Sequence, residues 1–108
     1  MLTIEASDDV KKKWAKSMEY FYALHLGALS NEVRSAVLKV ETLPIQRRPA
    51  SLYRCELLIT PYHGHVIKNR VDRENCSAAI DYAFAKAKRT LTRRARGVGK
   101  EAFFRKTG

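Results

Sequence analysis

The sequence contains few of the residues that build disulfide-bonded or metal-bound proteins. Its two cysteines, Cys55 and Cys76, form no CxxC pair and cannot make a disulfide framework, so we expect two buried, reduced thiols. Two of the three histidines, His63 and His65, flank Gly64, but no cysteine or acid stands at ligand spacing from them. We therefore expect polar turn histidines, with no metal site and no cofactor.

Long apolar runs are also absent. No stretch approaches the ~18 apolar residues of a membrane span, and the first residues, MLTIEASDDVKKK, lack the basic start and apolar run of a signal peptide. Glycines occur singly, without a phosphate-binding loop, and no cysteine–histidine pattern indicates a nucleophile. The sequence predicts a cytoplasmic protein that is not an enzyme.

Acidic residues almost disappear from the last quarter of the chain. Residues 1–81 hold 12 basic and 10 acidic residues, whereas residues 82–108 hold 9 basic residues and 1 acid. The net charge of +10 therefore comes almost wholly from the C-terminal part, where it reaches +8. Positive charge concentrated in this way indicates an anionic partner.

The apolar pattern predicts a single domain with two helices and four strands. With strands read from alternation and helices from a three-to-four-residue spacing, the elements are expected in the order strand, helix, three strands, helix, at residues 2–6, 10–29, 33–42, 52–60, 65–71 and 75–96. Ser7 is expected to cap the first helix. One sheet face could carry both helices, which gives a two-layer α+β sandwich. We expect the domain to span residues 1–97, followed by a short, basic, flexible tail at 98–108.

The last helix carries an apolar stripe and a basic stripe on roughly opposite sides. The apolar stripe consists of Cys76, Ile80, Ala83, Phe84, Ala87 and Leu91. The basic stripe consists of Lys86, Arg89, Arg93 and Arg96. It is about 15 Å long by the helical rise, which suits several successive phosphates of a nucleic acid.

Other cations could extend this surface. Lys88 lies on the same helix, and Lys12, Lys13 and Lys16 of the first helix would join the patch if the two helices lie side by side. Arg94 falls close to the apolar stripe and could instead cap the C-terminus of the helix.

Three partners could explain a basic amphipathic helix: a membrane, a nucleic acid or only water. A mostly alanine apolar stripe packs closely on a sheet and inserts poorly into lipid. A solvated helix usually interleaves both signs of charge, which this helix does not do after Asp81. RNA fits best, because Lys and Arg gain free energy on phosphates by counterion release and Arg also stacks on bases.

The segment ENCSAAIDYAFAKAKRTLTRR resembles the final helix of the ribosome hibernation promoting factor (HPF/RaiA) family. The matching positions are Ala78, Ala79, Ile80 and Asp81, which form AAID, followed by Lys86, Arg89, Leu91 and Arg93. LKVE at residues 38–41 is similar to the second strand of that family, and LTI at residues 2–4 fits the first. Ser77 departs from the pattern, since many members carry Tyr there. The likeness covers about residues 2–96, and without a second domain the chain resembles the short forms.

The resemblance implies both a fold and a function. The fold would be β-α-β-β-β-α, with a four-stranded sheet and two helices on one face, related to double-stranded-RNA-binding domains. Members bind the small ribosomal subunit in the cleft for messenger and transfer RNA and keep ribosomes inactive when growth slows. This implies a cytoplasmic, ribosome-associated protein that binds ribosomal RNA. We expect it to bind neither a membrane nor DNA and to form no obligate homo-oligomer.

The residues expected to contact RNA combine the two helices. They are Lys86, Arg89, Arg93, Arg96, Lys88, Lys12, Lys13 and Lys16. Two alternatives stay open at this point: a general structured-RNA-binding module that acts away from the ribosome, and a protein-interaction adaptor whose charge is incidental.

Overall fold

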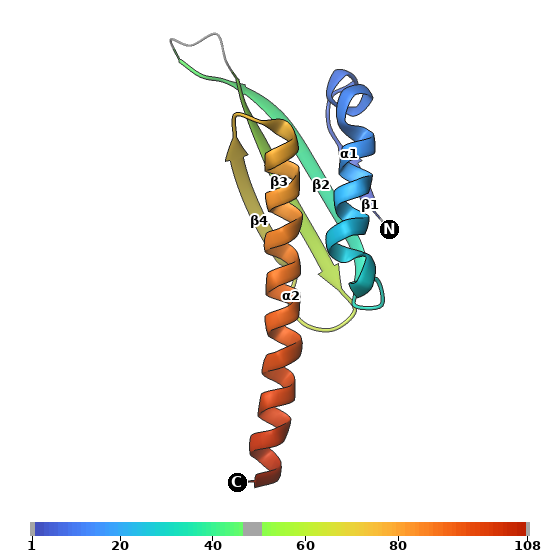
Figure 1. Cartoon of the computed structure of the whole chain (residues 1–108), viewed down its shortest axis with the longest axis vertical. Helices are drawn as coiled ribbons and strands as arrows, with labels where there is room; N and C mark the ends of the chain where they lie inside the picture. The colour runs from blue at the N-terminus through green and yellow to red at the C-terminus, as the bar shows by residue number, and fades with distance from the viewer. Residues whose placement is uncertain (1, 47–50, 108) are drawn as a thin grey trace.

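The computed structural model describes the backbone of residues 2–46 and 51–107 and the side chains of residues 2–46 and 51–95. Its elements are β1 (Leu2–Glu5), α1 (Asp8–Leu26), the 3-10 turn η1 (Gly27–Leu29), β2 (Val33–Pro44), β3 (Ser51–Pro61), β4 (Ile67–Arg73) and α2 (Cys76–Thr107). The predicted order of strands and helices and the α+β fold class are confirmed (Figure 1).

The four strands form one mixed sheet in the order β1-β2-β3-β4. β1 pairs with β2 in parallel, and β2–β3 and β3–β4 pair antiparallel. A parallel pair needs a crossover connection, which α1 provides. Both helices lie side by side on one face of the sheet, and no helix of residues 2–46 and 51–107 covers the other face (Figure 1). This arrangement is the two-layer sandwich that the sequence predicts.

The strands of the central hairpin are longer than predicted. β2 continues to Pro44 and β3 begins at Ser51, so both ends of the expected loop LPIQRRPAS belong to strands, with Pro44 paired to Ser51. Cross-strand pairing extends the strands beyond the region of clear apolar alternation. Residues 47–50 of that loop lie outside the described part of the chain.

Side-chain caps mark the starts of both helices. Ser7 Oγ accepts a hydrogen bond from the Val10 N–H at 3.4 Å, which confirms the predicted cap of α1. Asn75 Oδ1 accepts one from the Ala78 N–H at 2.9 Å at the start of α2. Each cap satisfies an amide that has no partner within its helix.

The C-terminal helix is longer than the sequence indicates. Its backbone continues to Thr107, past Gly97 and Gly99, and its last turns extend beyond the end of the sheet (Figure 1). The side chains from Arg96 onward lie outside the described residues. The expected domain boundary at 97 and the flexibility of residues 98–108 therefore stay predictions.

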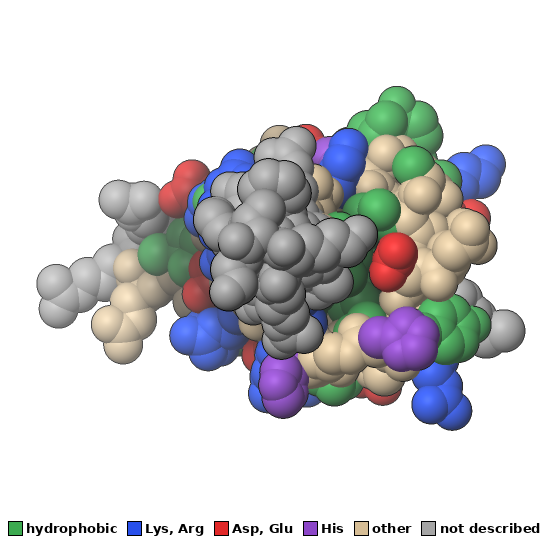
Figure 2. Space-filling view, turned by 90° about the horizontal axis from the view of Figure 1, so that it is seen from below, with side chains coloured by type: hydrophobic (Ala, Val, Ile, Leu, Met, Phe, Trp, Pro, Cys, Tyr) green, Lys and Arg blue, Asp and Glu red, His purple; other side chains and the backbone are tan. Residues whose placement is uncertain are grey.

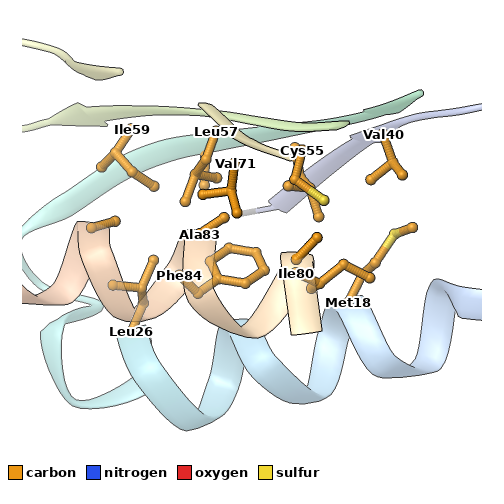
Figure 3. Close-up of a cluster of buried hydrophobic side chains, with 14 of the residues drawn as sticks. Met18, Leu26, Val40, Cys55, Leu57, Ile59, Val71, Ile80, Ala83 and Phe84 are labelled. Carbon is orange, nitrogen blue, oxygen red and sulfur yellow. The ribbon is translucent and has the colours of Figure 1, made fainter. Parts of the chain in front are cut away.

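The core lies between the sheet and the two helices (Figure 3). Alternate strand residues point into it, as predicted, and they are Ala36, Leu38, Val40, Cys55, Leu57, Ile59, Ile67 and Val71. All six residues of the predicted α2 stripe are buried. From α1, Met18 and Leu26 are buried, whereas Trp14 and Phe21 are only partly buried at the margin of the core.

Small residues let α2 approach the sheet closely. Ala79, Ala83 and Ala87 are fully buried, and the Asn69 side-chain amide of β4 donates to the Ala83 carbonyl at 3.2 Å. A side chain longer than a methyl group at these positions would have to displace α2 from β3 and β4. The Ala-rich stripe thus packs against the sheet, as the sequence predicts.

The two cysteines are free and buried, which confirms the expected thiols. Burial raises the pKa of the Cys55 thiol to about 12 and that of the Cys76 thiol to about 11. Because the thiolate is the reactive form, both groups are unreactive near neutral pH.

We expect Ala83→Leu to lower the free energy of unfolding by about 1–3 kcal/mol, because the added methylenes overpack the contact between α2 and the sheet. Ala78→Leu makes the same change at an exposed position of the same helix and should alter it by less than about 0.5 kcal/mol. Urea unfolding followed by circular dichroism measures both. Equal effects of the two substitutions would mean that α2 packs with a different face.

We also expect both thiols of the native protein to react with a disulfide reagent at mildly alkaline pH on the order of a hundredfold more slowly than in the urea-unfolded chain, since their pKa values are raised. Release of the chromophoric thiol from the reagent gives the rate. Rapid reaction of the folded protein would contradict the burial of Cys55 and Cys76.

Candidate nucleic-acid interface

Three cations form a straight line on the exposed side of α2. Lys86, Arg89 and Arg93 are all exposed, and their spacing of three and four residues places them on one face of the helix. We call these three residues the basic row. Its centre lies about 140° around the helix from the buried stripe, by the helical turn. Arg96, the fourth residue of the predicted stripe, has a side chain outside the described residues.

The cations of the basic row have no acidic partner among the described residues. The ion pairs found there join Lys39 to Glu41 and Arg54 to Asp72, and Asp81 is hydrogen-bonded to His25. A row of exposed, uncompensated cations creates a positive potential beside the helix. In Figure 2, a view toward the C-terminal end of α2, blue side chains with some red ones lie on the left, and green side chains gather on the right, where α1 lies.

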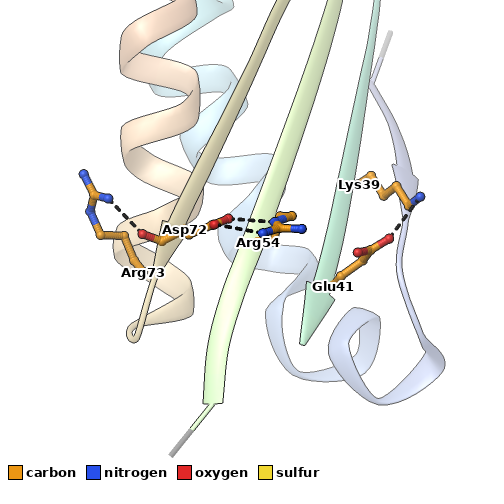
Figure 4. Close-up of polar contacts among 5 residues, drawn as sticks. All are labelled: Lys39, Glu41, Arg54, Asp72 and Arg73. Carbon is orange, nitrogen blue, oxygen red and sulfur yellow. Dashed lines mark hydrogen bonds and ion pairs between the residues drawn. The ribbon is translucent and has the colours of Figure 1, made fainter. Parts of the chain in front are cut away.

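On the outer face of the sheet, unlike the basic row, cations form ion pairs with acidic side chains (Figure 4). The Arg54 guanidinium holds Asp72 with two hydrogen bonds, of 3.0 and 3.1 Å, and lowers the pKa of that carboxyl. Lys39 Nζ lies 3.0 Å from the Glu41 carboxylate, which raises the pKa of the lysine by hydrogen bonding. Arg54 lies on β3 and Asp72 on β4, so this ion pair joins two neighbouring strands.

The lysines of α1 do not continue the basic row. The helices lie side by side, as the prediction required, and Lys12, Lys13 and Lys16 are exposed. Lys13, however, acts electrostatically on the Cys76 thiol and so lies near the first turn of α2. Lys86 is ten residues farther along that helix, about 15 Å by the helical rise. The three lysines form a second group of cations, separate from the basic row. Their contact with RNA stays a prediction.

Lys88 also lies off the basic row. It is exposed, but it sits about 130° around α2 from the centre of the row, by the helical turn. Asp81, seven residues earlier, lies on the same side as Lys88 and contacts α1 through His25. Lys88 therefore lies on the side of α2 that faces α1. Its contact with RNA stays a prediction, and its position on the helix does not make it part of the basic row.

A contact between His25 and Asp81 joins the two helices. His25 Nε2 and Asp81 Oδ1 lie 2.5 Å apart and form a hydrogen bond, and the His25 ring stacks on Phe21 with centroids 6.2 Å apart. Asp81 is the last acid before the basic row, and this hydrogen bond uses it to join the two helices. The bond also holds α1 on one side of α2. Nothing in the sequence around His25 indicates a partner 56 residues away, so the pattern of residues does not predict this contact.

Arg94 holds the connection between β3 and β4. Its guanidinium donates a hydrogen bond to the His65 carbonyl, close to Gly64, whose φ of 94° is in the left-handed region. The prediction that Arg94 could cap the C-terminus of α2 is wrong, since the helix continues beyond it to Thr107. His63 and His65 are both exposed, as expected for turn residues.

The described residues contain little that would suit a small ligand. A shallow hollow of about 280 Å³ on the outer sheet face is lined by Glu56, Lys68, Asn69 and Arg70, which mix both signs of charge. Within the described ranges, no group of three or more His, Cys, Asp or Glu side chains is placed to hold a metal ion. Nor does any helix there have the length and apolar character to cross a membrane.

We expect Arg94→Ala to lower the free energy of unfolding by about 1 kcal/mol, because it removes a charged donor from the β3–β4 connection. Arg93→Ala removes the same charge from the adjacent, unpaired position and should change stability by less than about 0.5 kcal/mol. Urea unfolding measures the difference, and hydrogen exchange should show faster exchange around His65 only in Arg94→Ala. Equal stabilities of the two variants would remove the structural role of Arg94.

Solved structures with a similar fold come from the type of protein that the sequence predicts. One is a ribosomal subunit interface protein from Coxiella burnetii, with a TM-score of 0.69 and 9% identity, covering 88% of this chain and 97% of that one. Another is the N-terminal domain of Protein Y from Thermus thermophilus, with a TM-score of 0.56 and 14% identity, covering 84% and 93%. No family model and no curated protein matches this chain. The fold is therefore that of HPF/RaiA-type proteins, as predicted.

Proposed function

We propose that this chain is a short-form HPF/RaiA-like protein that binds the RNA of the small ribosomal subunit through the basic row of α2. On this proposal it occupies the cleft for messenger and transfer RNA and keeps ribosomes inactive under stress or in stationary phase. It acts in the cytoplasm, without catalysis, a cofactor or a membrane. The observation that carries the proposal is the unpaired row, Lys86, Arg89 and Arg93, on a fold shared with a ribosomal subunit interface protein.

The chemistry of the row supports an RNA backbone as its partner. Each Lys or Arg that neutralises a phosphate releases condensed counterions, so the affinity falls with salt by a slope of about −0.7 per contact on single strands. Arg89 and Arg93 add planar, bidentate contacts to phosphate oxygens. Because the row is not neutralised by acids, binding would not require breaking an existing ion pair.

A general RNA-binding module acting away from the ribosome is the second candidate. It is favoured by the low identity to the similar structures, 9% and 14%, which leaves the surface free to have changed. Both candidates use the basic row as the RNA contact, but they differ in the RNA that the protein binds. Binding to small ribosomal subunits distinguishes the two candidates directly.

We expect the triple variant Lys86→Glu, Arg89→Glu and Arg93→Glu to lose co-sedimentation with small ribosomal subunits at low salt, while its far-UV circular dichroism is unchanged. In a salt series the wild-type protein should dissociate progressively. The loss of three phosphate contacts should reduce the magnitude of the slope of log affinity against log salt concentration by about 2. Lys12→Glu, Lys13→Glu and Lys16→Glu change the net charge equally and should weaken binding less, since these lysines lie away from the row.

Two outcomes would contradict the proposal. If the wild-type protein remains at the top of the gradient at low salt, ribosome binding is wrong. If it then still binds a structured RNA in solution, the second candidate takes its place. Equal weakening by the α1 and α2 triple variants would mean that net charge matters and the row does not.

A further inference from the structure

An exposed aromatic ring stands in line with the basic row. Tyr82 precedes Lys86 by four residues, Arg89 by seven and Arg93 by eleven, so all four side chains share one face of α2. Tyr82 is 44% exposed although it is a large, mostly apolar residue. The ring and the row together span about 16 Å along the helix.

Arg73, the last residue of β4, lies over this ring. Its guanidinium carbon is 4.8 Å from the centroid of Tyr82, which is a cation–π contact. The same guanidinium donates a hydrogen bond of 2.8 Å to the Asp72 carbonyl, drawn in Figure 4. These two contacts place the guanidinium beside the ring in the free protein.

The carboxylate of Asp72, the acid that precedes Arg73, is bound by another arginine. The Arg54 guanidinium holds the Asp72 carboxylate through two hydrogen bonds across the sheet. Arg73 donates instead to the backbone carbonyl of Asp72. Arg73 is exposed at the corner where β4 leads into α2, and its charge helps to lower the pKa of Asp72. The corner combines an exposed ring, a guanidinium that lies over it and the nearby ammonium of Lys86.

We propose that Tyr82 and Arg73 form a stacking site for one unpaired RNA base. Every base has a π face, and aromatic rings and guanidinium planes are the groups on which proteins stack unpaired bases. Lys86, one turn along the helix, would meet a neighbouring phosphate, and Arg89 and Arg93 the following ones. The site makes a single-stranded or looped segment the ligand of the row, since a continuous duplex offers no free base. This inference rests on the proposed function and names the RNA that the row selects.

A purely structural role would predict a different surface. An arginine and a tyrosine that only fasten the end of β4 to α2 gain most when the ring is desolvated. Tyr82 instead keeps nearly half of its surface in solvent, in line with three unpaired cations. The two roles also differ in measurement, because a fastening contact changes stability and a base site changes affinity for one form of RNA.

The test compares Tyr82→Leu with Tyr82→Phe on two fluorescein-labelled RNAs, an unstructured single strand and a blunt duplex of the same length. Leucine keeps apolar bulk without a π face, and phenylalanine keeps the ring. We expect Tyr82→Leu to weaken single-strand binding by about 5- to 150-fold, the range for loss of one base–aromatic stack. Duplex binding and the salt slope should not change, since no phosphate contact is lost. Tyr82→Phe should bind both RNAs as the wild-type protein does.

Lys86→Gln serves as the control for a phosphate contact. It should weaken binding to both RNAs and reduce the magnitude of the salt slope by about 1. Wild-type affinity of Tyr82→Leu for the single strand, with or without a lower melting temperature, would overturn the base site while leaving the proposed function in place. Failure of the wild-type protein to bind either RNA or the ribosome would overturn the proposed function and the base site together.

Discussion

The close contact between the alanine face of α2 and strands β3 and β4 determines where the other functional side chains lie. Ala79, Ala83 and Ala87 are fully buried and have no rotamers with which to adapt, so they fix both the distance and the rotation of the helix. A shift of the buried stripe by one residue toward the N-terminus would turn the helix by about 100° and bring the basic row against the sheet. The same residues therefore build the core and orient the cations on the opposite side.

The distribution of paired and unpaired charge distinguishes the two faces of the molecule. On the outer sheet face, pairs such as Arg54 and Asp72 contribute little to stability because they are partly open to solvent, but they cancel the field of the cations they bind. On α2 no acid performs this cancellation for Lys86, Arg89 or Arg93 within the described residues. The basic row thus presents unpaired positive charge along one side of α2, from which an anionic partner can approach.

Periodicity predicted the parts of this structure that depend on burial alone. Strand residues such as Leu57 and helix residues such as Ile80 are buried because a two-residue or 3.6-residue spacing puts them on the core side whatever the partner. Contacts between distant elements follow from tertiary geometry, so the hydrogen bond from Arg94 to the His65 carbonyl could not be read from the sequence. For the same reason the sequence allowed the α1 lysines to lie beside the row but did not determine the offset that separates them. Tyr82 could have been found from its spacing to Lys86, but its contact with Arg73 could not.

A fold shared at 9% and 14% identity shows how little of the sequence the architecture requires. Many apolar side chains of suitable volume fill such a core, so the fold limits the partner less than the exposed side chains do. Phosphate contacts from a row of cations give affinity but do not separate a duplex from a single strand, because both present a charged backbone. An exposed ring at one end of the row supplies that distinction, since only an unpaired base can stack on it. On the proposed function, the selectivity of α2 for a form of RNA would depend on Tyr82 and its neighbour Arg73, and the strength of binding on the cations that follow.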